Sequence, residues 1–136
     1  MTDLIQRLTL AIFRQEGNGP THPNPGNLRD CPWFVGQPPV RMANDKLVSR
    51  RKYPDGSPVL YNGNFWIPQS RAQGEAGAFH VVALRVAMGQ SLTQFISAWA
   101  PPSENDTAKY IANVKAWAAI QDASAPLWDY LMEVPT

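Results

Sequence analysis

The stretch Ile12-Phe13-Arg14-Gln15-Glu16-Gly17-Asn18-Gly19 puts an acidic residue where an apolar helix ends. Apolar side chains recur at helical spacing over residues 2–16, and Gly17 is a residue type that ends helices in a left-handed turn. Glu16 then lies beside apolar side chains at the negative end of the helix dipole, and both effects favour its protonated form. Such a carboxyl can act as a general acid. The alternative is a partly exposed glutamate at the end of a helix, without a role.

Length and composition limit the classes of function. A chain of 136 residues suits a single domain over residues 1–136, and its net charge of +1 gives no general reason to bind nucleic acid or an anionic membrane. The only cysteine, Cys31, excludes an internal disulfide and a cysteine-based metal site. His22 and His80 lack the spacing of metal ligands, so we expect neither a metal nor a cofactor.

No targeting or membrane segment is apparent in the sequence. No apolar run is long enough to cross a bilayer, and the N-terminus lacks the apolar core and cleavage site of a signal peptide. We therefore expect synthesis in the cytoplasm without a signal peptide. If the protein acts outside the cell, another factor must carry it there.

The sequence predicts an α+β fold that is mostly helical, with a small sheet inserted after the first helix. Glycine, proline and asparagine are dense over residues 17–46, and the two prolines within residues 22–27 predict a rigid loop. Residues 52–61 predict a hairpin with an Asp55-Gly56 turn, followed by a short strand at Phe65-Trp66-Ile67.

Helices are expected again after this small sheet. Small residues around Gly77 would let another helix approach closely, Gly89 would end that helix, and Pro101-Pro102 would end the next one. The expected helix starts are Thr2 or Asp3, Ser70 or Gln73, Ser91, the segment Ser103-Glu104-Asn105-Asp106-Thr107, and Ser124 or Ala125.

Five blocks occur in an order typical of a known family. They are Gln15-Glu16-Gly17, Asn24-Pro25-Gly26-Asn27-Leu28-Arg29, a helix around Gly77, Ser91-Leu92-Thr93-Gln94-Phe95-Ile96, and Trp99 to Ile111, which contains Ala-Pro-Pro-Ser-Glu-Asn-Asp-Thr. Over residues 5–115 this order resembles small bacteriophage and prophage proteins with a lysozyme-like domain, often described as structural proteins of the virion. These proteins are similar to lytic transglycosylases and goose-type lysozymes.

The resemblance implies a peptidoglycan-cleaving site in a cleft between a helical body and a small sheet. It implies that Glu16 is the catalytic acid and that Asn24 and Asn27 lie on a loop that helps to build the site. Tyr110 matches the tyrosine that faces the acid in lytic transglycosylases. The chain departs from the family pattern over residues 30–76, where a longer, basic segment leads into Phe65-Trp66-Ile67-Pro68-Gln69-Ser70.

A hydrolase of this type usually needs a second carboxylate, for which Asp30, Asp45 and Asp55 are candidates without a distinctive setting. A lytic transglycosylase needs no second carboxylate, because the N-acetyl group and C6 hydroxyl of its substrate take part. We therefore expect a muralytic glycosidase with a single acid, Glu16. It would cleave the β-1,4 bond between N-acetylmuramic acid and N-acetylglucosamine.

Other side chains allow weaker assignments. Trp33 and Trp66 lie in loop or sheet regions and are candidates for stacking on sugars, whereas Trp99 and Trp117 are expected in the core. The expected substrate-binding residues are Asn24, Asn27, Trp66 and Tyr110. Arg50, Arg51 and Lys52 are expected on a solvated hairpin face, and attraction to teichoic acid or to the carboxylates of the peptide stem is the weaker alternative. Asn105 is expected at a helix start, and His80 without a chemical role.

Two further readings remain open besides an enzyme of cell wall degradation. The chain could be a non-catalytic virion or peptidoglycan-binding module that keeps the fold, because a fold does not establish a function. DNA binding through residues 49–52 is disfavoured by the near-zero net charge. The expected partners are a glycan strand and other virion proteins, in a virion-associated or wall-delivered protein.

Overall fold

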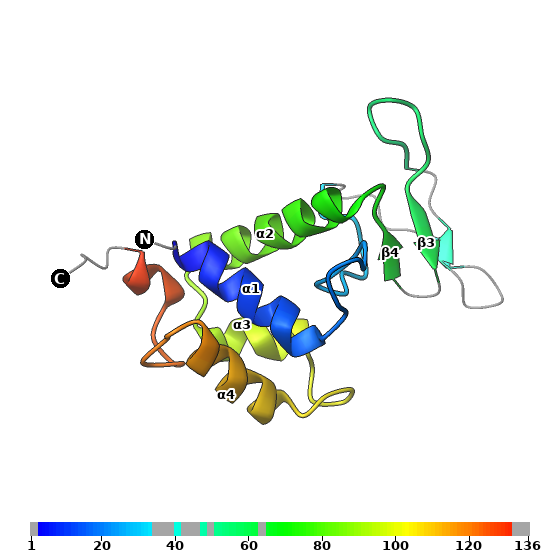
Figure 1. Ribbon diagram of the computed structural model, residues 1–136. Helices are drawn as coiled ribbons and strands as arrows, with labels where there is room; N and C mark the ends of the chain where they lie inside the picture. The colour runs from blue at the N-terminus through cyan, green and yellow to red at the C-terminus, as the bar shows by residue number, and fades with distance from the viewer. Residues whose placement is uncertain (1–2, 34–39, 42–46, 49–50, 63–64, 132–136) are drawn as a thin grey trace. The chain divides into compact units, whose positions relative to one another are not determined.

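The computed structural model describes residues 3–33, 40–41, 47–48, 51–62 and 65–131 (Figure 1). The chain forms two compact units, one made of residues 1–15 and 81–136 and the other of residues 16–80. Helices α1 (Leu4–Glu16) and α2 (Arg71–Ala87) each contribute residues to both units. That residues 1–136 form a single lysozyme-like domain stays a prediction.

Helix α1 has the cap and the stop that its sequence predicts. The Asp3 side chain accepts a hydrogen bond from the backbone N–H of Ile5 at 2.6 Å, so the helix begins at Leu4. It ends at Glu16, because Gly17 takes a left-handed backbone with φ of 67°.

Helices α3 (Leu92–Trp99) and α4 (Thr107–Trp117) of the first unit also begin at capping residues. Ser91 and Gln94 form a capping box before α3, as expected. The cap of α4 is Asp106, whereas the Asn105 side chain donates to the Pro101 carbonyl. The last helix is a 3₁₀ turn, η1 (Leu127–Tyr130), which begins after the expected start at Ser124 or Ala125.

The core of the first unit forms where these helices pack together. Helices α3 and α4 lie against each other (Figure 1), and α1 and the end of α2 add to the same cluster. Its fully buried side chains include Leu8, Ile12, Val82, Phe95, Ile96 and Val114. The expectation that Trp117 is a core residue is wrong: it is 37% exposed, and the Arg14 guanidinium lies 4.2 Å from its ring centroid.

The second unit holds the small sheets. Strands β1 (Val40–Arg41) and β2 (Leu47–Val48) pair antiparallel, and so do β3 (Leu60–Asn62) and β4 (Phe65–Ile67). The predicted turn before β3 is present, because Gly56 has φ of 86° and donates its N–H to the Tyr53 carbonyl. The predicted strand at residues 65–67 is β4.

Helix α2 begins after Ser70, whose hydroxyl accepts from the Gln73 N–H at 3.1 Å. In the described part of this unit, the small residues of α2 do not pack against another helix, although this was expected from the sequence. A Cβ at Gly74 would lie 1.9 Å from the Pro23 carbonyl oxygen, and one at Gly77 would lie 2.9 Å from the Trp66 ring. The missing side chains therefore make room for the loop before residue 24 and for β4.

The fold is α+β, with four α-helices and two small antiparallel sheets among the described residues. The sheets follow α1, so the predicted fold class is confirmed. None of the described helices has the length and apolar composition needed to cross a membrane.

We expect the substitution Gly74→Ala to destabilise the protein. Replacing a glycine by alanine in an open helix adds about 0.5–1 kcal/mol of stability. Here the added methyl group meets the Pro23 carbonyl, and such overpacking costs about 1–3 kcal/mol. Urea unfolding measures the difference, with Ala72→Gly at an exposed position of the same helix as the control for helix propensity. A Gly74→Ala protein more stable than the parent would contradict this contact.

Candidate functional site

The carboxyl group of Glu16 is held by a short chain of side-chain amides. Glu16 is half-buried at the end of α1, and its Oε2 accepts a hydrogen bond from Asn27 Nδ2 at 2.9 Å. The Oδ1 atom of Asn27 accepts from Asn18 Nδ2, also at 2.9 Å. Two amides therefore fix the orientation of one acid, and all three residues lie in the second unit.

The backbone around Asn27 explains how its side chain reaches the acid. Asn27 has φ of 51°, in the left-handed region that asparagine tolerates better than most residues. Its N–H donates to the Asn24 carbonyl at 3.0 Å, which closes a turn over residues 24–27. Asparagine at this position supplies both the turn and the donor to Glu16.

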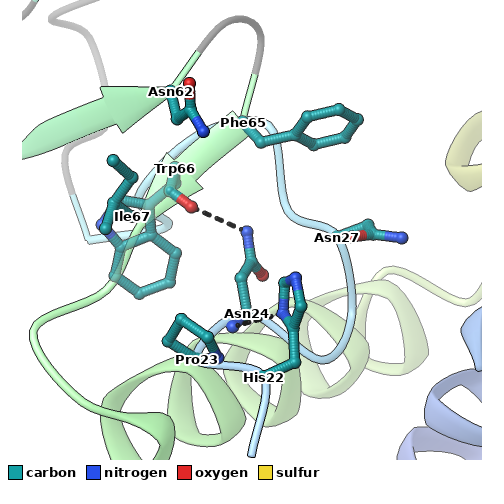
Figure 2. A pocket seen from close by; sticks show the side chains of 8 residues that line it. All are labelled: His22, Pro23, Asn24, Asn27, Asn62, Phe65, Trp66 and Ile67. Atoms are coloured by element: carbon teal, nitrogen blue, oxygen red, sulfur yellow. Dashed lines mark hydrogen bonds between the residues drawn. The ribbon is translucent and has the colours of Figure 1, made fainter. Parts of the chain in front are cut away.

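The side chain of Asn24 ties this loop to β4. It is only 3% exposed, and its Nδ2 donates to the carbonyls of Leu28 and Trp66, each at 2.9 Å. Its Oδ1 accepts from the Leu28 N–H at 2.9 Å. Figure 2 shows this side chain reaching from the loop to the main chain of β4. Both amide hydrogens are used within the protein, so Asn24 supports the site and has no N–H left to donate to a ligand.

The loop is also attached to α2. The Arg71 guanidinium donates to the carbonyls of Gly19 and His22, each at 2.9 Å, and forms an ion pair with Glu75. The Nδ1 atom of His22 accepts from the Asn24 N–H at 3.0 Å. The rigid loop expected over residues 22–27 is thus bonded to a strand on one side and to a helix on the other.

A pocket of about 280 Å³ opens beside Asn27. We call it the Asn27 pocket; its lining residues are His22, Pro23, Asn24, Asn27, Asn62, Phe65, Trp66 and Ile67 (Figure 2). None of these side chains is an acid, a lysine or an arginine. Phe65 and Ile67 are 43% and 37% exposed, so the wall formed by β4 is apolar. Asn27 belongs both to this pocket and to the hydrogen bond with Glu16.

The indole of Trp66 has a packing role. It is 1% exposed, donates its Nε1–H to the Tyr53 hydroxyl at 2.9 Å and meets the Trp33 ring edge-on, with centroids 5.8 Å apart. A ring buried in this way offers no face for a sugar, although the residue lines the Asn27 pocket. Its neighbours Phe65 and Ile67 alternate with it along β4 and are exposed.

The remaining candidate for substrate binding is in the other unit. Tyr110 lies on α4, is 4% exposed and belongs to the apolar core. The structure therefore groups Glu16, Asn24, Asn27 and Trp66 in the second unit, and it gives Tyr110 a position in the core of the first.

The candidates for a second carboxylate have structural partners of their own. Asp30 pairs with Arg51 at 2.5 Å and accepts from the Tyr61 hydroxyl. Burial, aided by the Asp30 charge, raises the pKa of Tyr61. Asp55 accepts from the N–H and hydroxyl of Ser57, and these bonds lower the pKa of its carboxyl.

Arg51 is therefore not part of a solvated hairpin face: it is 5% exposed, because Asp30 and the Tyr61 hydroxyl bind its guanidinium. Lys52 is exposed, as expected. Arg50 and Asp45 lie outside the described residues.

Several residues of the site were not predicted as ligands or supports. Asn18 could have been noticed because it follows the glycine that ends α1. Phe65 and Ile67 could have been noticed because they alternate with Trp66 along the strand, and this pattern indicates that they share an exposed face. The role of Arg71 could not be predicted, because the loop carbonyls that it binds, those of Gly19 and His22, are distant in the sequence and come close only on folding. The His22 side chain binds an N–H only two residues away, but it was not predicted as a support of the loop. Among the described residues, no three histidine, cysteine, aspartate or glutamate side chains gather to hold a metal ion.

Comparisons of this chain with protein-family models, with curated proteins and with solved structures found no match. Any functional assignment therefore depends on the residues of the site and their geometry.

We expect Asn24→Asp to destabilise the second unit by more than about 2 kcal/mol, because two buried carbonyls would lose their donor and face a carboxylate. Chemical unfolding followed by tryptophan fluorescence measures this loss. Asn62→Asp, on an exposed strand position of the same pocket, is the matched control and should change stability by less than about 0.5 kcal/mol. Equal effects of the two substitutions would contradict the structural role of Asn24.

Proposed function

We propose that the chain is a muralytic enzyme that cleaves the β-1,4 bond between N-acetylmuramic acid and N-acetylglucosamine in peptidoglycan. One observation carries this proposal: the Glu16 carboxyl is oriented by Asn27, and Asn27 also lines a pocket of about 280 Å³. A half-buried acid, a fixed donor and an adjoining uncharged pocket are the parts that glycoside cleavage by a single acid requires. The order of sequence blocks that resembles lysozyme-like phage proteins supports the same assignment.

In this proposal Glu16 donates a proton to the oxygen of the leaving sugar. The Asn27 amide N–H binds Oε2, so the orientation of the carboxyl group is set before substrate arrives. The uncharged lining and the exposed Phe65 and Ile67 suit the neutral, partly apolar surface of an N-acetylated sugar. Asn24 acts indirectly, by holding the loop that carries Asn27.

We favour a lytic transglycosylase over a hydrolase with two carboxylates. Asp30 and Asp55 are both engaged in hydrogen bonds that support the local fold. In the transglycosylase reaction, the C6 hydroxyl of the muramoyl residue attacks its own anomeric carbon as the glycosidic bond breaks. Glu16 protonates the leaving oxygen and then accepts the C6 hydroxyl proton, so the product is an anhydro sugar and no water is consumed.

We expect Glu16→Gln to abolish cleavage while the fold is kept, because glutamine has a similar shape but cannot supply the proton. The loss in rate should be at least about 10²–10⁴-fold. Mass spectrometry of fragments released from purified peptidoglycan measures both rate and mechanism. Fragments heavier by one water would identify a hydrolase instead.

The control for this experiment is Glu104→Gln, at an exposed position in the other unit. Equal cleavage by the Glu16→Gln variant and the parent would refute the catalytic assignment. Binding to cell walls without cleavage by either protein would instead identify a non-catalytic wall-binding or virion module.

We expect Asn27→Gly to lower kcat by about 10–100-fold. Glycine keeps the left-handed backbone and removes only the amide that orients the carboxyl, and a misplacement of a catalytic group by about 1 Å can cost about 10²-fold in rate. Steady-state kinetics with soluble glycan strands measures the effect, and the exposed Asn105→Gly substitution is the control. An unchanged kcat would show that the Asn27 bond does not position the acid.

The partners and location follow from the same proposal. The substrate is the glycan strand, and the protein is carried in a virion, where it contacts other virion proteins, or is delivered to the cell wall by another factor. Western blotting of purified particles tests the first of these routes.

A further inference from the structure

A second pocket of the same unit has a different chemistry. It has a volume of about 480 Å³ and is lined by Trp33, Lys52, Tyr53, Pro54 and Gln73; we call it the Trp33 pocket. Trp66 connects the two pockets, because it lines the Asn27 pocket and contacts both Trp33 and Tyr53.

The Trp33 ring is a fixed apolar surface of this pocket. It remains 43% exposed although it meets the Trp66 ring edge-on and lies 6.2 Å from the His80 ring, centroid to centroid. An aromatic ring held by two neighbours and still half open to solvent is suited to contact a ligand.

The polar groups that the Trp33 pocket can offer to a ligand are donors. The Gln73 Oε1 is already used by the Tyr53 hydroxyl at 3.2 Å and the Gln69 N–H at 2.7 Å. The Gln73 Nε2 donates one hydrogen to Gln69 at 2.9 Å and retains a second. The Tyr53 hydroxyl, which donates to Gln73, also accepts from Trp66.

Lys52 is the one charged residue among the described residues that line this pocket. It is exposed, and within the described part of the chain no carboxylate lies within ion-pair distance of its ammonium group. The described lining thus combines one cation, one amide donor and an aromatic surface, and none of its five residues is acidic. This combination fits a single carboxylate attached to a small apolar body, whereas a phosphate group prefers more donors.

We propose that the Trp33 pocket binds a carboxylate of the stem peptide carried by the glycan strand, with Lys52 as the charge partner and Trp33 against the peptide side chains. This proposal rests on the proposed function, since the Asn27 pocket would hold the sugar from which that peptide branches. Lys52 and Trp33 would then determine a preference for strands that carry peptides, without taking part in the cleavage itself.

The binding test uses the whole chain with Glu16→Gln, so that no cleavage interferes. A stem tetrapeptide with free carboxyl groups is titrated while the indole N–H signals are followed by NMR. We expect saturable binding that shifts the Trp33 signal, assigned with the conservative Trp33→Phe variant. Affinity should fall about tenfold in Lys52→Met, and equally when the carboxyl groups of the peptide are amidated. Lys109→Met, an exposed lysine of the other unit, is the matched control.

Three results would overturn the proposal: unchanged affinity in Lys52→Met, equal binding of the amidated peptide, or binding of glycerol phosphate in preference to the tetrapeptide. The last result would identify a phosphate site.

The cleavage test separates this proposal from the proposed function. With Glu16 intact, Lys52→Met should lower kcat/KM for peptide-bearing strands about tenfold and leave kcat/KM for strands stripped of peptides unchanged. Equal loss on both substrates, or on neither, would contradict the peptide site while cleavage itself persists. Absence of cleavage by the parent protein would instead refute the proposed function, and the tetrapeptide titration would still decide whether the pocket binds a carboxylate.

Discussion

The candidate site depends on the three hydrogen bonds of the buried Asn24 side chain, which hold the loop before β4 in place. One of them joins the loop over residues 22–28 to the Trp66 carbonyl of β4, and the other two bind the backbone of Leu28 and hold the loop itself in shape. An amide can do this because it offers donors and an acceptor at once, which matches two carbonyls and one N–H. An apolar side chain of the same size would leave those backbone groups without partners, and a charged one would carry the cost of its own desolvation.

The position of Glu16 depends on this attachment through Asn27. The left-handed residue directs its amide to the carboxyl, and the turn that contains it is closed on the Asn24 carbonyl. Arg71 and Gly74 complete the support from α2, one by binding loop carbonyls and the other by leaving room for the Pro23 carbonyl. The acid, the loop, the strand and the helix thus form one connected set of contacts, and most of them are made to backbone atoms.

Much of the local structure could be predicted because its causes lie close together in the sequence. Asp3, Ser91 and the Asp55-Gly56 pair form caps and turns with residues two to four positions away, and Gly17 ends α1 by its own backbone freedom. By contrast, the buried Arg51 pairs with Asp30, which lies 21 residues away, and nothing in either neighbourhood indicates this pair. The small residues of α2 did indicate a close neighbour, but the predicted neighbour was another helix, whereas Gly74 and Gly77 lie against Pro23 of the loop and Trp66 of β4. The sequence predicted that the loop is rigid, but it did not show that β4 would form a wall of the pocket beside the loop, because Trp66 of β4 lies 42 residues from Asn24.

The division of the chain into two units also has a consequence for biosynthesis. Residues 16–80 form one uninterrupted segment, whereas the other unit combines residues 1–15 with residues 81–136. Arg7 of α1 bonds to the carbonyl of Ala118, 111 positions later. At a synthesis rate of about 5–20 residues per second, α1 emerges from the ribosome many seconds before this partner exists. During that interval the apolar face of α1 lacks the residues of the segment 81–136 that bury it in the folded unit, and it is open to a nascent-chain chaperone.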